Sequence, residues 1–346
     1  MISERGGEER VLAALRQALG ARVGGPGVEI GIGDDAAVLR PPPGRLVATV
    51  DMLVEGQHFL RRGPMAGQPA DVGWQAMAVN LSDVAAMGGR PLWALCSLGL
   101  PDDLEAGEVE SLYAGMAEAA EAFGVAVVGG NLARLAERLV VDVTVLGVVD
   151  RPLCRGRARP GDYLCMTGRV GAAAAGLHLA RTDAGKRDGS APLLAALRRP
   201  QPRVREGIAL GALGGDAIRS ACDLSDGLAV DLCRLLAPGV DAVLWQDHLP
   251  VPDAVRATAE AAGVDPLEWV LHGGGDYELA CAVAPAAIAQ AQAALVRVGQ
   301  APLHTIGICE AAEPGGRLYI APRQDGTRRP VARSGWDPFR QFRAWR

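Results

Sequence analysis

Two short apolar runs near the start of the sequence are bordered by carboxylates. Residues 36–39 follow Asp34 and Asp35, residues 46–50 precede Asp51, and the turn between the runs contains Pro-Pro-Pro-Gly. Short apolar runs separated by such a turn are typical of paired strands, which would bring Asp34 or Asp35 near Asp51. An aspartate after glycine is more often a turn residue bonded to its own backbone, and for this pair taken alone that alternative is favoured.

The tripeptide Leu-Ser-Asp occurs in each half of the sequence. It ends at Asp83 and at Asp226, and Asp223 precedes the second copy. A Ser-Asp pair at the start of a helical pattern is ordinary N-cap chemistry. Acidic residues gathered from distant parts of a chain, however, repel one another unless a cation binds them, and oxygen ligands without cysteine or histidine pairs suit Mg²⁺. Together with Asp51, these residues predict a magnesium site.

The length and charge of the chain limit its class. A chain of 346 residues is long enough for two domains, and its net charge of −5 gives no reason to expect nucleic acid as a partner. No apolar run reaches the roughly 20 residues that span a bilayer, and the first residues lack the apolar core of a signal peptide. The seven cysteines are far apart and odd in number, which argues against a disulfide framework. We therefore expect a cytoplasmic protein with no membrane partner.

Strand and helix patterns alternate through the first half of the sequence. After an amphipathic helix over 8–19, strands are expected near 30, 46–54, 92–98, 126–128 and 139–149, and helices near 71–87 and 105–123. This order predicts an α/β (α+β) fold whose N-terminal mixed sheet carries helices on one face. Turn signals interrupt the pattern at 150–160, so we expect domains at 1–150 and 151–346.

Glycine-rich turns are candidates for phosphate contacts. One such turn follows the expected strand 163–167 and begins a helix that runs to Arg181. This arrangement either presents helix N–H groups to an anion or is simply a β–α joint. Gly129-Gly130 and Gly273-Gly274-Gly275 allow a ligand to approach the backbone closely, and a strand-entry bulge is an equally favoured reading of each.

Motifs of several common enzyme classes are missing from the sequence. It contains no Walker Gly-x-x-x-x-Gly-Lys-Ser/Thr, no Gly-x-Ser-x-Gly elbow and no kinase His-Arg-Asp loop, and its five histidines lack zinc spacing. If the protein handles nucleotide phosphates, metal ions, arginine side chains and backbone N–H groups must neutralise them.

A series of motifs occupies residues 31–35, 51–59, 78–88, 223–227 and 273–279. In content and order this series resembles the thiamine-monophosphate kinase family, which shares a superfamily with aminoimidazole ribonucleotide synthetase, selenophosphate synthetase and the hydrogenase-maturation dehydratase. The block Asn-Leu-Ser-Asp-Val-Ala-Ala-Met-Gly is the most specific of these motifs, and the resemblance covers nearly the whole chain.

The resemblance implies an enzyme that transfers a phosphoryl group from ATP to thiamine monophosphate, the last step of thiamine diphosphate biosynthesis. It also implies an N-terminal domain whose sheet pairs in a homodimer, a C-terminal α/β domain that completes the active-site cleft, and several Mg²⁺ ions. Phosphoryl transfer requires mainly positioning and charge neutralisation, so we expect direct in-line attack by the substrate phosphate and no obligatory protein base.

The resemblance also assigns residues, and it favours Asp35 over Asp34. Metal binding is assigned to Asp35, Thr49, Asp51, Asp83, Asn131, Asp223 and Asp226. ATP binding is assigned to Tyr113, Gly130, Asn131, Arg155 and Ser225. Substrate binding is assigned to His58, Gly275 and Trp336.

Three positions depart from the family pattern. Asn131 stands where the family shows aspartate, Val50 where it shows threonine, and Gly275 where it shows glutamate. The first change removes a charge from the expected metal site, and the last removes a carboxylate that we would expect to contact the substrate. Two alternatives therefore remain open: an ATP-using enzyme of the same superfamily with a different acceptor, and a non-catalytic protein that binds a nucleotide or thiamine phosphate.

Overall fold

The computed structural model describes residues 15, 17–63, 66–182, 189–299, 301–323, 327–337 and 339. The expected helix over 8–19 therefore lies mostly outside the described residues. Contacts within the chain divide it into two compact units, described separately below. The N-terminal unit runs to Val84 and resumes over Arg90–Asp150, and the C-terminal unit consists of Ala85–Gly89 and the described chain from Arg151 onward.

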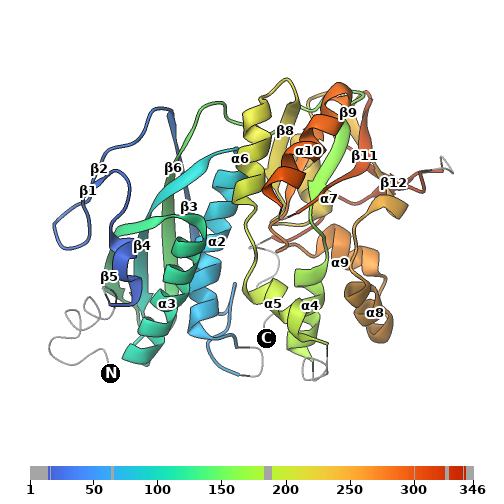
Figure 1. The fold of residues 1–346 in the computed structure, drawn as a ribbon. Coiled ribbons are helices and arrows are strands. Elements are labelled where there is room, and N and C mark those ends of the chain that lie inside the picture. Colours follow the sequence, from blue (N-terminus) through green and yellow to red (C-terminus); the bar gives the residue numbers. More distant parts are fainter. Residues whose placement is uncertain are drawn as a thin grey trace. The chain divides into compact units, whose positions relative to one another are not determined.

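A four-stranded sheet forms the centre of the N-terminal unit (Figure 1). Its order is β3-β6-β4-β5, and β6 is antiparallel to both of its neighbours whereas β4 and β5 are parallel. The antiparallel pair β1-β2 is a separate small sheet. These strands are β1 (Val28–Ile30), β2 (Val38–Leu39), β3 (Arg45–Val54), β4 (Arg90–Leu100), β5 (Ala126–Arg134) and β6 (Val140–Val149), and a short 3₁₀ turn, η1, covers Gly20–Val23.

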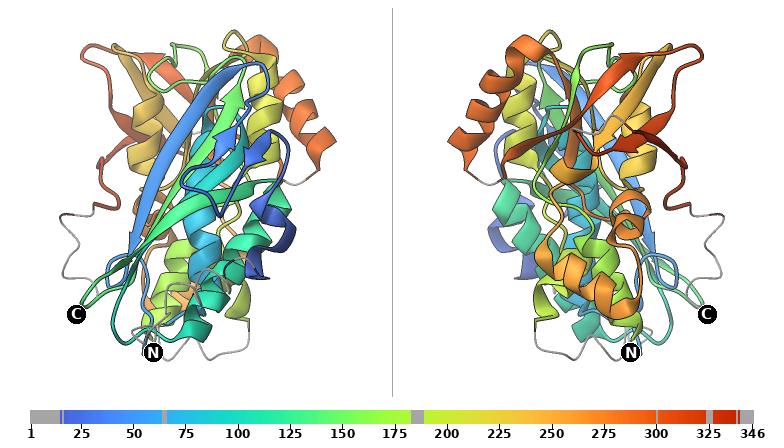
Figure 2. Two further views of the ribbon diagram at one scale, coloured as in Figure 1. Left: turned by 90° about the vertical axis from the view of Figure 1, so that its left-hand side faces the viewer. Right: turned by 90° about the vertical axis from the view of Figure 1, so that its right-hand side faces the viewer.

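Two long helices, α2 (Pro69–Ala86) and α3 (Ala106–Phe123), pack together on one face of this sheet, as the views of Figure 2 show. The two helices approach closely because glycine lies at their contact. A Cβ atom added to Gly115 of α3 would lie 1.8 Å from the carbonyl oxygen of Ala70 of α2, so no larger residue fits there.

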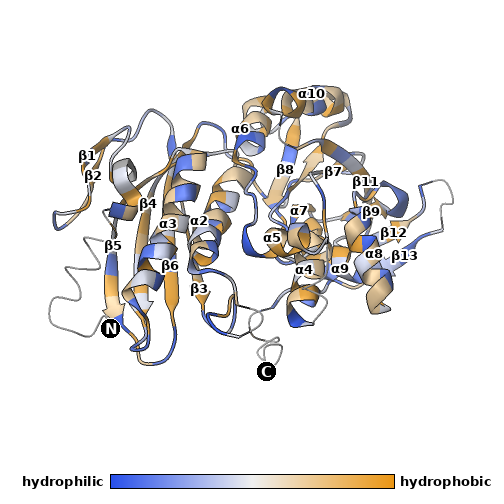
Figure 3. Ribbon diagram, turned by 60° about the horizontal axis from the view of Figure 1, so that its bottom comes forward, coloured by the Kyte–Doolittle hydropathy of each residue, from blue (hydrophilic) through white to orange (hydrophobic). Residues whose placement is uncertain are grey.

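The two faces of the sheet differ in burial. On β6, Val141, Val143 and Val145 are fully buried and face the helices, whereas the residues between them are half-buried on the opposite face. We call this the open face; residues of β1 and β2 pack on the part of it around Trp93 and Val148. Strand β3 pairs with β6 along its whole length, so its residues follow the same alternation. On the open face β3 exposes apolar side chains, and Figure 3 shows β3 and β6 as largely hydrophobic. The most exposed of them are Leu46 (63%), Val50 (57%) and Met52 (50%).

A seven-stranded sheet forms the centre of the C-terminal unit, in the order β13-β12-β9-β11-β7-β10-β8. Among the described strands of this sheet, only β12 and β9 pair in parallel. These strands are β7 (Tyr163–Thr167), β8 (Ile218–Asp223), β9 (Val240–Trp245), β10 (Leu279–Val283), β11 (Leu303–Ala311), β12 (Leu318–Ala321) and β13 (Arg329–Val331).

Helices cover both faces of this sheet (Figure 1), and every residue of strand β10, next to the edge strand β8, is buried. One core cluster joins the sheet to α7 and α9 through residues such as Leu232 and Leu271. The helices are α4 (Ala172–Arg181), α5 (Ala191–Arg198), α6 (Val204–Leu213), α7 (Leu228–Leu235), α8 (Asp253–Ala262), α9 (Pro266–His272) and α10 (Ile288–Val298), with 3₁₀ turns η3 (Gln246–His248) and η4 (Pro285–Ala287). The predicted mixed α/β fold is confirmed. In the described part of the chain, no helix combines the length and apolarity of a membrane span.

Candidate active site

Strand β3 and helix α2 bring two of the predicted metal ligands into contact. Thr49 and Asp51 pair with the buried residues Val145 and Val143 of β6, so both side chains lie on the helix-covered face. There the Thr49 hydroxyl donates a hydrogen bond of 2.6 Å to Asp83 Oδ2 near the end of α2. A strand edge and a helix thus hold oxygen donors from two distant motifs side by side.

At Asp34 and Asp35 the structure shows part of the turn alternative, in which an aspartate binds the neighbouring backbone. The Asp34 carboxylate accepts the backbone N–H of Asp35 at 2.9 Å, and both residues are exposed. Among the described residues, no three aspartate, glutamate, histidine or cysteine side chains are grouped closely enough to hold a metal ion. The role of Asp35 as a metal ligand therefore stays a prediction.

Asn131 lies apart from Thr49 and Asp51 within the sheet. It pairs with Ser97 of β4, which pairs with Asp142 on the open face of β6. Since β5 and β3 are the two edges of the sheet, two strands separate them and the distance across is about 14 Å at the usual strand spacing. One chain alone does not bring Asn131 to the Thr49–Asp83 pair.

Two predicted ATP contacts lie close to β4. A Cβ added to Gly130 would lie 1.8 Å from the carbonyl oxygen of Cys96, so the glycine is required by the close approach of β5 to β4. Tyr113 is 1% exposed in the core between α3 and the sheet, with its hydroxyl next to the Cys96 thiol. Burial raises the pKa of both groups, that of Cys96 to about 12. The role of Tyr113 as an ATP contact stays a prediction.

The loop after β3 holds His58 in one protonation state. The backbone N–H of Val54 donates to His58 Nδ1 at 3.0 Å, and burial lowers the pKa of the imidazole. Because Nδ1 accepts a hydrogen bond, the proton of the neutral ring resides on Nε2.

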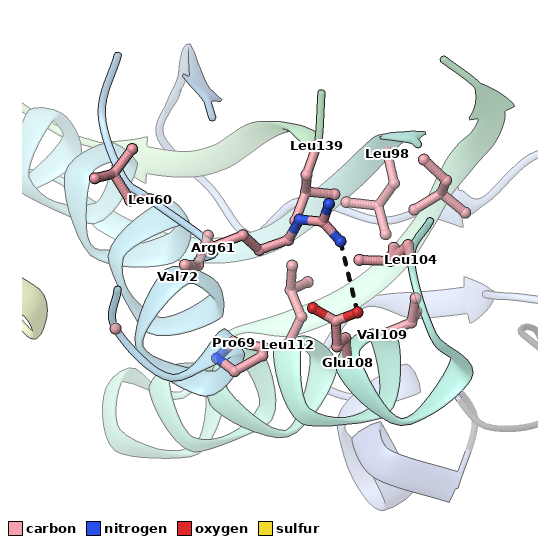
Figure 4. Close-up of a pocket in the computed structure, with 12 residues that line it drawn as sticks. Leu60, Arg61, Pro69, Val72, Leu98, Leu104, Glu108, Val109, Leu112 and Leu139 are labelled. Carbon is pink, nitrogen blue, oxygen red and sulfur yellow. Dashed lines mark ion pairs between the residues drawn. The ribbon is translucent and has the colours of Figure 1, made fainter. Parts of the chain in front are cut away.

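Arg61, which the motifs did not single out, fastens the end of this loop. Its side chain is 5% exposed and points among leucine side chains beside a cavity of about 10 Å³ (Figure 4). The guanidinium bonds to Glu55 (3.2 Å) and Asp103 (2.6 Å), and it lies 3.5 Å from Glu108. Three carboxylates around a buried arginine thus fix the loop that carries His58.

In the C-terminal unit, Asp223 and Arg155 form an ion pair. Asp223 is the last residue of β8 and is 3% exposed, and its Oδ1 lies 3.6 Å from Arg155 Nη2. A predicted metal ligand and a predicted ATP contact therefore lie next to each other in this unit.

Asp231 and Arg234, which the sequence analysis missed, shape the loop that carries Asp226. The fully buried Asp231 carboxylate accepts the backbone N–H groups of Asp226 (2.9 Å) and Gly227 (3.2 Å). Arg234 donates to Asp231 at 2.5 Å and also pairs with the Asp226 carboxylate. Burial raises the pKa of Asp231 to about 6, despite the nearby arginine. Asp231 and Arg234 are three residues apart on α7, so both side chains lie on the same side of the helix, toward Asp226. This spacing of opposite charges was the sequence signal that could have identified them.

The N–H groups of the glycine turn before α4 are already bound by a carboxylate of the same chain. The Asp276 carboxylate accepts the backbone N–H groups of Gly171 (2.8 Å) and Ala173 (3.2 Å). The turn is therefore a joint closed by Asp276, and not an open anion site.

The glycine run before Asp276 is bound to the Asp226 loop. Gly275 N–H donates to the carbonyl oxygen of Ser225 at 2.9 Å, and a Cβ on Gly274 would lie 2.7 Å from the same oxygen. Trp336 N–H donates to the carbonyl oxygen of Asp226 at 2.7 Å. Three predicted site residues, Ser225, Gly275 and Trp336, are thus gathered around one loop.

Comparison with known families accounts for both units. The model of the AIR synthase related protein N-terminal domain matches residues 33–149, and that of the C-terminal domain matches residues 159–318. The chain is thus a two-domain protein of the AIR synthase related class.

Within this class, curated thiamine-monophosphate kinases are similar to the chain. That of Rhodopirellula baltica is 36% identical over 75% of this chain and 78% of its own length, and that of Escherichia coli K12 is 38% identical over 73% and 75%. The thiamine-monophosphate kinase structure from Stenotrophomonas maltophilia K279a superposes with a TM-score of 0.76 at 33% identity, covering 89% of this chain and 95% of that one. AaThiL complexed with AMPPCP and TMP gives a TM-score of 0.72 at 29% identity, covering 96% of each chain. The chain belongs to the thiamine-monophosphate kinase family.

Proposed function

We propose that this protein transfers the γ-phosphoryl group of ATP to the phosphate of thiamine monophosphate, producing thiamine diphosphate and ADP. The observation that carries the proposal is the Thr49–Asp83 contact, which joins two oxygen donors assigned to metal binding, one on a strand and one on a helix. The similarity to a structure complexed with AMPPCP and TMP supports this pair of substrates.

The donors available for a metal fit Mg²⁺ in their chemistry. Thr49, Asp51 and Asp83 offer only hydroxyl and carboxylate oxygens, which Mg²⁺ prefers over sulfur or imidazole. We assign these three residues and Asp35 to metal binding in the N-terminal unit, and Asp223 and Asp226 in the C-terminal unit. Bound Mg²⁺ would supply charge neutralisation for the two phosphate groups.

The chain's own residues account for the rest of the catalysis. A phosphate monoester is already largely ionised at pH 7, so the acceptor oxygen needs no protein base. Two unit charges about 4 Å apart repel by about 4 kcal/mol at an effective dielectric of 20, so cationic groups beside the phosphates lower the barrier. We assign this role on the phosphates of ATP to Arg155, whose guanidinium lies 3.6 Å from the Asp223 carboxylate. His58, with its proton on Nε2, serves as a neutral hydrogen-bond donor to the acceptor.

We propose that two copies pair through the open face of the four-stranded sheet. The exposed apolar side chains of Leu46, Val50 and Met52 lie on that face, where a partner would cover them. Pairing of two such sheets would also set the β5 edge of one copy beside the β3 edge of the other. The partner would then supply the Asn131 that one chain keeps about 14 Å from its own Thr49.

A steady-state assay with Mg²⁺, ATP and thiamine monophosphate tests the function. The proposal expects ADP and thiamine diphosphate in equal amounts. ADP formed with a different phosphate acceptor would favour another enzyme of the class, and ATP binding without ADP would favour a non-catalytic binding protein.

A further inference from the structure

A segment near the C-terminal end, residues 332–337, lies against the loop that carries Asp226. Gly335 is pressed onto this loop, because an added Cβ would lie 2.2 Å from the Asp226 carbonyl oxygen and 2.9 Å from Val230 Cγ2. The same carbonyl oxygen accepts the Trp336 N–H at 2.7 Å. The backbone at 335–336 is therefore in direct contact with the loop, and this contact fixes the backbone position from which the Trp336 side chain extends.

The side chain of His272 binds this segment from the other side. His272 is the last residue of α9, and its Nδ1 lies 2.8 Å from the Ser334 carbonyl oxygen and 3.1 Å from Ser334 Oγ. A carbonyl oxygen can only accept, so Nδ1 carries the proton and donates to it. The imidazole thus links α9 to the residue two positions before Trp336.

The backbone around His272 is closely packed at two glycines, Gly227 and Gly273. A Cβ on Gly227 would lie 3.1 Å from the Leu271 carbonyl oxygen and 3.3 Å from His272 Cα, so α9 ends directly against the Asp226 loop. Gly273 has no room for a side chain either, because its Cβ would lie 2.4 Å from the Trp269 carbonyl oxygen. A rigid helix end therefore presents the imidazole at a fixed position.

We propose that His272 is a positioning residue that holds Trp336 for the heteroaromatic part of the acceptor. An indole binds a cationic or electron-poor ring by stacking and cation–π attraction, and both depend on where the indole lies. Loss of the His272 hydrogen bond frees Ser334 and loosens Trp336, while the phosphate-binding residues keep their places. The proposal rests on the proposed function, because the family resemblance makes Trp336 a substrate contact for thiamine monophosphate.

Two substitutions at His272 test the proposal. His272→Phe keeps a ring of similar size and removes the donor, whereas His272→Asn keeps an N–H close to the position of Nδ1. In His272→Phe we expect KM for thiamine monophosphate to rise about tenfold, as loss of one hydrogen bond predicts, with kcat and KM for ATP within about twofold. His272→Asn should restore most of the affinity. Ser334→Ala should change little, because the main acceptor is the backbone carbonyl.

Hydrogen exchange gives a second readout that does not need activity. The Trp336 amide should exchange faster in His272→Phe than in the wild type, and His272→Asn should restore its protection. Unchanged exchange in His272→Phe, or equal KM for the acceptor in all three proteins, would overturn the proposal. If the wild type neither binds nor uses thiamine monophosphate, the proposed function fails, and with it the role of Trp336, while the exchange experiment still decides whether His272 holds the segment.

Discussion

The Thr49 hydroxyl donates a 2.6 Å hydrogen bond to the Asp83 carboxylate, which ties the edge strand β3 to helix α2. The two residues are distant in sequence, and the family resemblance assigns metal binding to both. The contact fixes the direction of one Asp83 oxygen and leaves the hydroxyl lone pairs of Thr49 available as donors to a cation.

Substitution of Thr49 should separate its two roles. We expect Thr49→Val to lower the free energy of unfolding by about 1 kcal/mol, the usual net value of one hydrogen bond, and to lower kcat/KM by about tenfold or more. Thr49→Ser keeps the hydroxyl and should retain most of the activity. Thermal unfolding and steady-state kinetics measure the two effects, and a fully active Thr49→Val enzyme would show that the hydroxyl is not part of the site.

Removal of a carboxylate charge beside Thr49 should abolish turnover without unfolding the protein. Mutation of a residue that only supports a metal ligand typically lowers activity about 10–100-fold. Asp51→Asn or Asp83→Asn alters an expected ligand itself and should lower kcat by at least about 100-fold. Glu110→Gln, an exposed change on α3, is the matched control and should be neutral. Mg²⁺ titration of activity and circular dichroism provide the measurements. Normal turnover in either aspartate variant would mean that the site is misplaced.

The ion pair between Arg203 and Glu278 should be the most costly to break in the C-terminal unit. Arg203 donates two hydrogen bonds, of 2.6 and 2.5 Å, to a Glu278 carboxylate that is nearly buried and also accepts from Thr167. Arg203→Met leaves that charge unpaired, and we expect a loss of about 3 kcal/mol in the free energy of unfolding. Arg205→Met, an exposed neighbour, should stay within about 0.5 kcal/mol. Equal urea midpoints for the two variants would contradict the prediction.

Asp276 should make stability depend on pH. Burial raises its pKa from 3.8 to about 7, although two backbone N–H groups bind the carboxylate. Between these values the folded protein binds a proton that the unfolded chain releases, so the contribution of Asp276 to stability is present at pH 3.8 and lost as the pH rises through about 7. Asp276→Asn removes this titration. The stability of the variant relative to wild type should therefore increase from acid to neutral pH, and a constant difference would contradict the assignment.

Exposed apolar residues of β3 should control assembly. Leu46→Glu places a charge on the open face of the sheet and should convert a dimer into a monomer in light scattering. Val296→Glu, at a position on α10 that is 76% exposed, is the matched control and should leave the mass unchanged. A wild-type monomer, or a Leu46→Glu dimer, would contradict pairing through this face.

Local sequence patterns predicted much of the N-terminal unit. The strand expected over 46–54 is β3 at Arg45–Val54, and the helix expected over 71–87 is α2 at Pro69–Ala86. Both are long runs rich in apolar residues and bordered by turn signals, so neighbouring residues suffice to define them. The short strands β12 and β13 were not predicted, because a strand of three or four residues in a tail rich in glycine, proline and arginine is defined only by its partner strand.

Contacts in the site between residues distant in sequence could not be predicted from local sequence patterns. The motif of Asn131 did not reveal that β5 is the far edge of the sheet, since strand order depends on pairing between distant segments. The glycine turn before α4 was a candidate anion site in the sequence, yet its N–H groups are bound by the carboxylate of Asp276, which is distant in sequence. The family resemblance assigned Thr49 and Asp83 to one metal site; the structure brings the two side chains into contact, and their role as metal ligands stays a prediction.

A single-turnover reaction with ATP radiolabelled in its γ-phosphate tests the central claim most directly. With thiamine monophosphate and Mg²⁺ present, direct in-line transfer predicts that the label appears in the terminal phosphate of thiamine diphosphate, in an amount equal to the ADP formed and with none bound to the protein. Label that is bound to the protein after incubation with ATP alone, or that is released as inorganic phosphate while thiamine monophosphate stays unchanged, would contradict the account.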